Sequence, residues 1–386
     1  MARPQQASSK ALLVTLTIGH MVNDFYGLVL PFLLPTLIVA FNMNFAAAGL
    51  LALVTDLLGG ILQPFSGFAG DRFAKRKSII ICGFLAFIIG LALVGVSTSY
   101  SMILFAWLVY GFGSAAFHPQ STNLLTRTYI YAKGRAMGIH GIGGAIGNFS
   151  APLVITFFVT VIGWRSTSFF LIIPGIAATL LVVRIVHEPQ NTSTESVRWH
   201  IPPSLWLLSL TFGLIYMAYK SFLTFLPTFL VQQGSTLSQA GYIASIMLFA
   251  GFIAQPLGGS IYDHIGGRWL FAISAALSAV ALVVFNMSDG ISDLISIAIF
   301  GAGISATFPV SLAMASDIAG SESIGLNTGI VFGLSGVLAA LTPAITGYMA
   351  DTIGLEAALE WLIVFPSVAL LTSLFLPNHQ KLVSTR

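Results

Sequence analysis

Long apolar stretches, separated by short polar breaks, recur along the whole chain. Each runs for about 20 residues or more, the length that an α-helix needs to cross a bilayer, whereas stretches of about 10–14 residues are typical of buried core helices. Turns, Gly/Pro pairs and charges divide the chain into twelve of them. Their approximate ranges are 11–41, 46–70, 78–97, 101–126, 135–161, 165–187, 203–231, 237–262, 268–287, 291–318, 322–350 and 356–377.

The composition excludes an ordinary soluble protein. Of the 386 residues, 56% are hydrophobic and only 8% are charged, and the mean hydropathy is +0.92. Soluble domains carry about 25% charged residues, so this chain has too few charges to cover the water-exposed surface of soluble domains of this total size. We therefore predict an all-α membrane protein with twelve transmembrane helices. The first stretch is too long for a signal-peptide core and has no A-x-A-like cleavage site, so we expect a retained helix.

The lysines and arginines predict the orientation. With a cytoplasmic N-terminus, fourteen of the sixteen lie at or near the cytoplasmic face, Arg165 lies outside and Lys220 lies within a stretch. Cytoplasmic loops of membrane proteins carry such an excess of positive charge. We expect a multi-pass protein of the cell (plasma or inner) membrane with both termini in the cytoplasm. The net charge of +3 then gives no indication of nucleic-acid binding.

Three pairs of segments match in the same order along the chain, at an offset of 190 or 192 residues. Q-P-F-S-G-F-A-G-D at 63–71 reappears as Q-P-L-G-G-S-I-Y-D at 255–263, Pro-Thr at 35–36 reappears at 227–228, and G-F-G-S-A-A-F-H-P at 111–119 reappears as G-A-G-I-S-A-T-F-P at 301–309. The matches predict two homologous six-span halves, 1–187 and 203–386, joined by a cytoplasmic linker at 188–202. Parallel repeats of this kind suit two halves that rock about a shared cavity.

Several motifs resemble those of a known family. G-F-A-G-D-R-F-A-K-R-K at 67–77 resembles the loop motif of the major facilitator superfamily, and 259–268 is a degenerate copy. More narrowly, H-M-V-N-D-F-Y at 20–26, the Q-P at 63–64 and S-A-A-F-H-P-Q-S at 114–121 resemble the fosmidomycin-resistance branch. Ala74 replaces the usual glycine of the loop motif, and Gln120 stands where an acidic residue is expected. The resemblance implies a major facilitator fold and a branch associated with drug export by proton antiport.

One polar stripe crosses the first stretch. Thr17, His20, Asp24 and Gly27 recur every three to four residues, with Asn23 beside them. Asp24 should lie near the middle of the bilayer, where a charged aspartate costs about 2.5–3.5 kcal/mol on insertion scales. Asp24 must therefore face a wet cavity, find a partner or hold a proton. It is either the group that binds and releases a coupling proton or a hydrogen-bonding residue between helices.

Other titratable groups share the N-terminal half. Asp56 lies at a similar depth in the second stretch, where it is either a second proton-binding group or a structural residue. His20, His118 and His140 form either a titratable relay or three separate structural hydrogen bonders. The histidines match no zinc spacing, and the depth count places His118 and His140 nearer the cytoplasm than Asp24, so we predict no metal site.

The seventh stretch carries a second polar stripe, which includes Tyr216 and Lys220, with Tyr219 beside it. Lys220 either forms a charge pair with Asp24 across the two halves or snorkels towards the membrane surface. We expect the substrate to bind between the halves. The predicted substrate-binding residues are Asn23, Asp24, Tyr216, Tyr219 and Lys220.

Two further motifs have competing interpretations. The glycines of 138–152 follow no strand, so they indicate close helix packing rather than a nucleotide-binding loop.

In the loop motif, Asp71 can pair with Arg76 or accept bonds from helix-end N–H groups and so latch the cytoplasmic side. Alternatively the basic residues act only as topological anchors, the role we expect for Lys75 and Lys77. The candidate latch residues are Asp71, Arg72, Arg76, Asp263 and Arg268.

These features predict a proton-coupled secondary transporter, an antiporter that exports a small organic compound by alternating access. We expect no enzymatic activity, cofactor, nucleotide or nucleic acid; the expected partners are a small-molecule substrate, protons and the lipid bilayer, and the protein should be a monomer. One alternative is an uptake symporter for an organic acid or sugar. Another is a non-transporting receptor or scaffold, which has no need for ionisable groups at mid-membrane depth.

Overall fold

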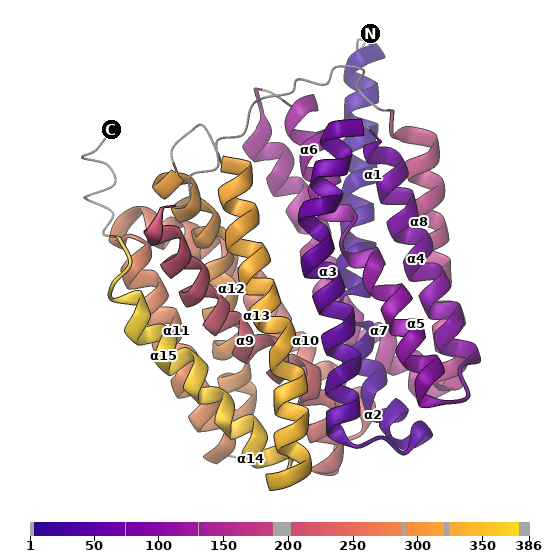
Figure 1. The fold of residues 1–386 in the computed structure, drawn as a ribbon, viewed down its shortest axis with the longest axis vertical. Helices are drawn as coiled ribbons and strands as arrows, with labels where there is room; N and C mark the ends of the chain where they lie inside the picture. Colours follow the sequence, from indigo (N-terminus) through magenta and orange to yellow (C-terminus); the bar gives the residue numbers. More distant parts are fainter. Residues whose placement is uncertain are drawn as a thin grey trace. The chain divides into compact units, whose positions relative to one another are not determined.

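The computed structural model describes residues 4–73, 75–129, 131–187, 202–287, 290–319 and 324–377. The side chain of Asp71 and most of the predicted linker, 188–201, lie outside the described part. All regular structure in the described residues is helical (Figure 1). The helices are α1 (Pro4–Tyr26), α2 (Val29–Phe41), α3 (Phe45–Phe73), α4 (Arg76–Val96), α5 (Tyr100–Ser114), α6 (Phe117–Thr128), α7 (Lys133–Phe170), α8 (Ile172–Ile185), α9 (Pro203–Gln232), α10 (Leu237–Ile265), α11 (Gly267–Met287), α12 (Ile291–Ala319), α13 (Ile324–Ile353), α14 (Leu355–Glu360), η1 (Trp361–Ile363) and α15 (Val364–Ser373).

These helices form twelve membrane spans, as the sequence predicts. Within the described ranges, eleven helical stretches are long and apolar enough to cross a bilayer, and one of them, Gly134–Ile185, is 52 residues long. At about 1.5 Å per residue that stretch is too long for one crossing. Gly163 interrupts it with a non-helical backbone (φ 76°, ψ 161°), which divides it into two spans.

Two spans are broken by a proline. The first span ends α1 at Tyr26 and restarts as α2 at Val29, and the fourth ends α5 at Ser114 and restarts as α6 at Phe117. A proline has no N–H for the carbonyl four residues earlier, and its ring clashes with that carbonyl. Pro31 and Pro119 each lie four residues after the start of the break, so both helices restart with the proline in their first turn.

The chain divides into two compact units. Unit 1 comprises Met1–Met43 and Val54–Glu195, and unit 2 comprises Asn44–Leu53 and Ser196–Arg386. The first residues of α3 therefore belong to unit 2, although the sequence repeat assigns them to the N-terminal half.

The sequence repeat reappears as a repeated helix crossing. In unit 1, Gly111 of α5 approaches the backbone of Thr55 on α3 so closely that a Cβ atom would meet it. In unit 2, Gly301 of α12 approaches the backbone of Met247 on α10 in the same way. The two pairs are related by the 190 and 192 residue offsets of the repeat. Glycine permits this close backbone approach at equivalent points of both units.

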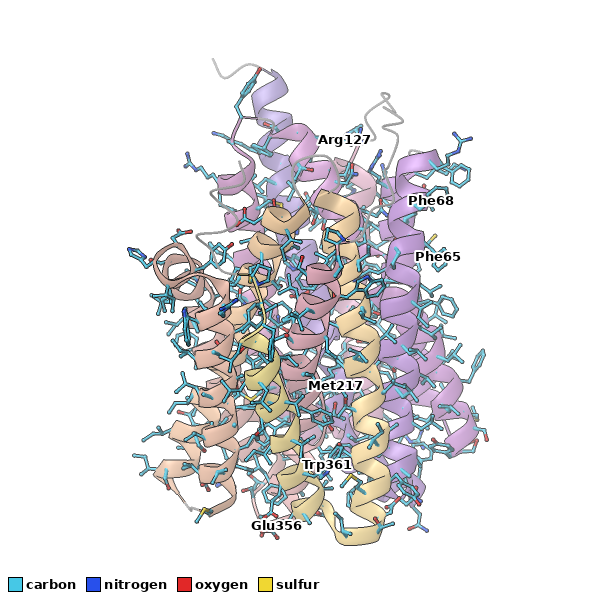
Figure 2. The ribbon with its side chains drawn as sticks, turned by 60° about the vertical axis from the view of Figure 1, so that its left-hand side comes forward. Phe65, Phe68, Arg127, Met217, Glu356 and Trp361 are labelled. Atoms are coloured by element: carbon cyan, nitrogen blue, oxygen red, sulfur yellow. The ribbon has the colours of Figure 1, made fainter. Side chains whose placement is uncertain are left out.

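Large apolar side chains cover much of the outer surface. Phe65 and Phe68 are each 66% exposed, and Figure 2 shows both pointing away from the ribbon of α3. In a soluble protein, contiguous exposed apolar surface of this kind would mark a binding site or an aggregation hazard. Here it suits contact with lipid.

Candidate functional site

The polar stripe of α1 is the foundation of the site. His20 and Asp24 lie one helical turn apart, and His20 Nε2 is 3.4 Å from Asp24 Oδ2. Their side chains are only 14% and 16% exposed. α1 packs against α6 and α7 within unit 1 (Figure 1), and these two helices supply the other members of the site.

α6 brings His118 to the opposite side of the carboxylate. His118 Nε2 lies 3.4 Å from Asp24 Oδ1, so the carboxylate stands between two imidazoles. The amide of Asn23 donates a 3.1 Å hydrogen bond to Asp24 Oδ1, and the same nitrogen lies 3.1 Å from His118 Nε2. Because α6 restarts at Phe117, His118 belongs to its first turn.

α7 contributes His140 and Asn148. The Asn148 amide donates a 3.1 Å hydrogen bond to Asp24 Oδ2. His140 is buried, its ring stacks on His20 with centroids 4.2 Å apart, and its Nε2 lies 3.3 Å from the hydroxyl of Ser121. The predicted histidine group is therefore one connected cluster.

Asn148 was not among the residues predicted from the sequence. The sequence does contain an indication of Asn148: His140, Gly144 and Asn148 are spaced four residues apart, so they share one face of a helix. The depth count separated His118 from Asp24, whereas His118 Nε2 lies 3.4 Å from Asp24 Oδ1. The depth expected for His140 stays a prediction, since its ring stacks on His20.

One backbone contact defines the chemistry of the cluster. His20 Nδ1 lies 2.8 Å from the carbonyl oxygen of His140. A carbonyl oxygen only accepts hydrogen bonds, so Nδ1 carries the hydrogen, and in the neutral ring Nε2 presents a lone pair. That lone pair faces the Asp24 carboxylate. The His20–Asp24 contact is therefore favourable when one of the two groups holds an additional proton, and unfavourable when neither does.

Hydrogen-bond donors and imidazoles of unit 1 surround the buried Asp24 carboxylate. Burying a charge is costly unless it is paired and hydrogen-bonded. Within unit 1, Asp24 has two amide donors, Asn23 and Asn148, and two imidazole neighbours, His20 and His118. The neighbours of the carboxylate are thus amides and imidazoles, and an unperturbed imidazole has a pKa of about 6.5.

The same side chains offer ligand atoms for a metal. One atom each from His20, Asp24 and His118 lie within 4.8 Å of one another. However, each carboxylate oxygen already accepts an amide hydrogen bond and faces a different imidazole. This arrangement fits protons shared between neighbours, and we assign no metal to it.

Asp56 and the predicted residues of the seventh span lie on other helices, α3 and α9. Asp56 is half-buried on α3 and is not one of the three ligating groups around Asp24. On α9 in unit 2, the half-buried ring of Tyr216 stacks on Tyr219 with centroids 5.8 Å apart and meets Phe308 edge-on at 5.4 Å. Lys220 is also half-buried on α9, and its pairing with Asp24 stays a prediction.

The basic residues of the loop motif tie helix ends together inside each unit. Lys77 Nζ, on α4, donates a 2.7 Å hydrogen bond to the carbonyl of Val183 near the end of α8. Arg268 Nε, on α11, donates a 2.7 Å bond to the carbonyl of Leu376, just after α15. The two contacts are similar in kind but not at aligned positions, because the 192-residue offset pairs Arg268 with Arg76. Lys77 therefore has a structural partner, and its topological role stays a prediction.

The remaining candidate latch residues are unevenly placed. Arg76 is fully buried, whereas Arg72 and Asp263 are exposed. Since the Asp71 side chain lies outside the described residues, the latch itself stays a prediction. The packing role of the fifth-span glycines is confirmed: Gly143 and Gly147 of α7 contact the backbone carbonyls of Thr17 and Met21 on α1.

Twelve spans built from a repeated six-span unit, with ionisable groups buried in the first unit, are the architecture of a secondary membrane transporter. The family model of the Major Facilitator Superfamily matches residues 16–234 and 208–385. The chain belongs to this superfamily. It is a multi-pass membrane transporter for small molecules and not an enzyme.

Individual relatives are distant but cover the whole chain. The chain is 24% identical to the MFS-type transporter YfnC of Bacillus subtilis (strain 168), over 96% of this chain and 94% of that protein. It is 23% identical to the fosmidomycin resistance protein of Escherichia coli (strain K12), over 97% and 94%. Among solved structures, a bacterial homologue of the human lysosomal transporter Spinster, inward-facing and occupied, has a TM-score of 0.85 at 17% identity over 97% of both chains.

Proposed function

We propose that this transporter couples proton movement to the export of a small organic compound, and that Asp24 with His20 and His118 binds the coupling proton. The observation that carries the proposal is the hydrogen bond from His20 Nδ1 to the His140 carbonyl, at 2.8 Å. It directs the Nε2 lone pair at the Asp24 carboxylate, so the pair is stable only with a proton between its members.

The net charge of the cluster changes with that proton. With one proton shared by Asp24 and its imidazoles the cluster is neutral, and without it the cluster carries one negative charge. A buried negative charge costs several kcal/mol unless water or a partner compensates it. Proton release therefore favours a conformation in which the site is hydrated or occupied by substrate, which is the coupling that alternating access requires.

His118 supplies the route by which the proton enters and leaves. Its side chain is 41% exposed, against 14% for His20 and 16% for Asp24. Imidazole exchanges protons readily near neutral pH. The direction of transport is supported by the similarity to the fosmidomycin resistance protein, and the substrate would bind near Asn23, Asp24, Tyr216, Tyr219 and Lys220.

The proposal is tested by transport in proteoliposomes with an imposed pH gradient and a panel of labelled phosphonates, organic acids and lipophilic cations. Asp24→Asn preserves size and hydrogen bonding but removes titration, so it should abolish gradient-driven transport and spare substrate binding. Asp56→Asn is the matched variant, because it removes a second aspartate outside the cluster. A normal rate in Asp24→Asn together with loss in Asp56→Asn would move the coupling site to Asp56. Substrate and protons moving in the same direction would make the protein a symporter.

A further inference from the structure

Three glycines of α7 face α1, and they contact different kinds of atom. A Cβ atom at Gly143 or Gly147 would meet the backbone carbonyl of Thr17 or Met21. A Cβ atom at Gly144 would lie 2.6 Å from His20 Nε2 and 2.6 Å from Asp24 Oδ2. Gly144 therefore leaves vacant the space beside the two atoms that share the proton.

The difference decides what a methyl group would do at each position. At Gly143 or Gly147 it would push two helix backbones apart, which damages packing. At Gly144 it would meet the far ends of two side chains, which can rotate away while α1 and α7 stay in place. The 3.4 Å contact between His20 and Asp24 thus depends on the bare backbone of Gly144.

Asn148, one turn further along α7, fixes the orientation of the Asp24 carboxylate. Its amide bonds Asp24 Oδ2, the same oxygen that faces His20, while the Asn23 amide bonds Oδ1, the oxygen that faces His118. Two amide donors on two oxygens hold the carboxylate plane so that each oxygen meets one imidazole. Without Asn148 the carboxylate is free to turn Oδ2 away from His20.

We propose that Gly144 and Asn148 are positioning residues for the coupling proton: α7 holds the Asp24 carboxylate against His20 without touching substrate. This inference rests on the proposed proton coupling at Asp24. Among the described residues of unit 1, the titratable groups that face Asp24 are His20 from its own helix and His118 from α6, with His140 of α7 stacked behind His20. Sites that hold a proton in a defined geometry need this kind of support from neighbouring residues.

The experiment compares Gly144→Ala with Gly141→Ala in proteoliposomes. Gly141 lies on the same helix, and a Cβ atom there would meet nothing within 4 Å. Two activities are measured: accumulation driven by a pH gradient, and substrate counterflow, which needs no gradient. We expect Gly144→Ala to fold, to retain counterflow and to lose about ten- to a hundredfold in driven accumulation, as misplaced reacting groups do. Gly141→Ala should match the unmodified protein in both.

Asn148→Leu is the second variant, because it keeps the size of the side chain and removes the donor. Its pH midpoint for driven transport should move to higher pH, since the carboxylate loses a donor that stabilises its ionised form. It also keeps the inference testable if Gly144→Ala does not fold. If Asp24→Asn uncouples transport but Gly144→Ala and Asn148→Leu both behave like Gly141→Ala, the positioning roles are wrong. If Asp24→Asn itself transports normally against a gradient, the proposed function is wrong instead.

Discussion

Asp351, near the end of α13, caps the N-terminus of α3 by binding the backbone N–H of Phe45, the first residue of that helix. Its carboxylate accepts hydrogen bonds from the backbone N–H groups of Phe45 at 2.8 Å and Ala46 at 2.9 Å. The next N–H, that of Ala47, donates to the side chain of Asn44 at 2.9 Å. The first N–H groups of a helix have no partner within it, and a carboxylate there also interacts favourably with the helix dipole.

Asp351→Ala should therefore lower the free energy of unfolding by about 0.5–2 kcal/mol, the usual cost of losing an N-terminal cap. Thermal unfolding of the purified protein in detergent measures the change. Asp351→Asn is the matched variant, because an amide oxygen still accepts one hydrogen bond, and it should cost less. Equal stability of the Ala variant and the unmodified protein would show that water replaces the cap without loss.

The paired contacts of Lys77 and Arg268 give a second prediction. Each donates at 2.7 Å to a carbonyl at the end of the last span of its unit, where helix carbonyls have no intrahelical partner. Lys77→Met and Arg268→Met should each lower stability by about 0.3–1 kcal/mol. Lys75→Met, which removes an exposed lysine next to α4, is the control. Thermal unfolding in detergent measures the changes. If all three variants unfold at the same temperature as the unmodified protein, Lys77 and Arg268 contribute only to membrane topology.

The span pattern could be predicted from sequence because it depends on local physics. Stretches of apolar residues, Gly163 and Gly266 at the ends of spans, and the repeat of 63–71 at 255–263 are all visible in the chain itself. The α1 stripe was visible for the same reason, since residues three to four apart share a helix face.

Contacts between helices were only partly predictable. The sequence left open whether His118 and His140 lie in one group with Asp24, and the packing of α6 and α7 on α1 brings them into one cluster. A count of residues along one span gives a depth but not the side chain of a neighbouring helix that packs there, as the His118–Asp24 contact shows. Lys77 and Arg268 donate hydrogen bonds to backbone carbonyls. Every residue has a backbone carbonyl, so the sequence does not indicate which one accepts the bond.

Topology provides a third prediction, based on the distribution of lysine and arginine. After Cys82, which is exposed, is replaced by alanine, single cysteines are introduced at Tyr131 and Gln233, both exposed in turns between spans. In intact cells a membrane-impermeant maleimide should label Gln233→Cys and spare Tyr131→Cys, because positively charged loops stay in the cytoplasm. Permeabilised cells, where both should react, are the control. The opposite pattern would invert the orientation of every span.

The last prediction concerns the proton shared by His20 and Asp24. His20→Gln keeps a donor but carries no titrating nitrogen, so it should shift the pH profile of transport and reduce gradient-driven accumulation. If the two residues act as one proton-binding unit, the double variant with Asp24→Asn should lose no more than Asp24→Asn alone, since residues in contact are not additive. His118→Gln, on the other side of the carboxylate, should slow proton exchange and leave the His20–Asp24 pair able to bind a proton. Accumulation measured at several pH values for the four combinations of the two sites tests this. Additive losses from His20→Gln and Asp24→Asn would mean that the two groups act independently and that the 3.4 Å contact between them is structural.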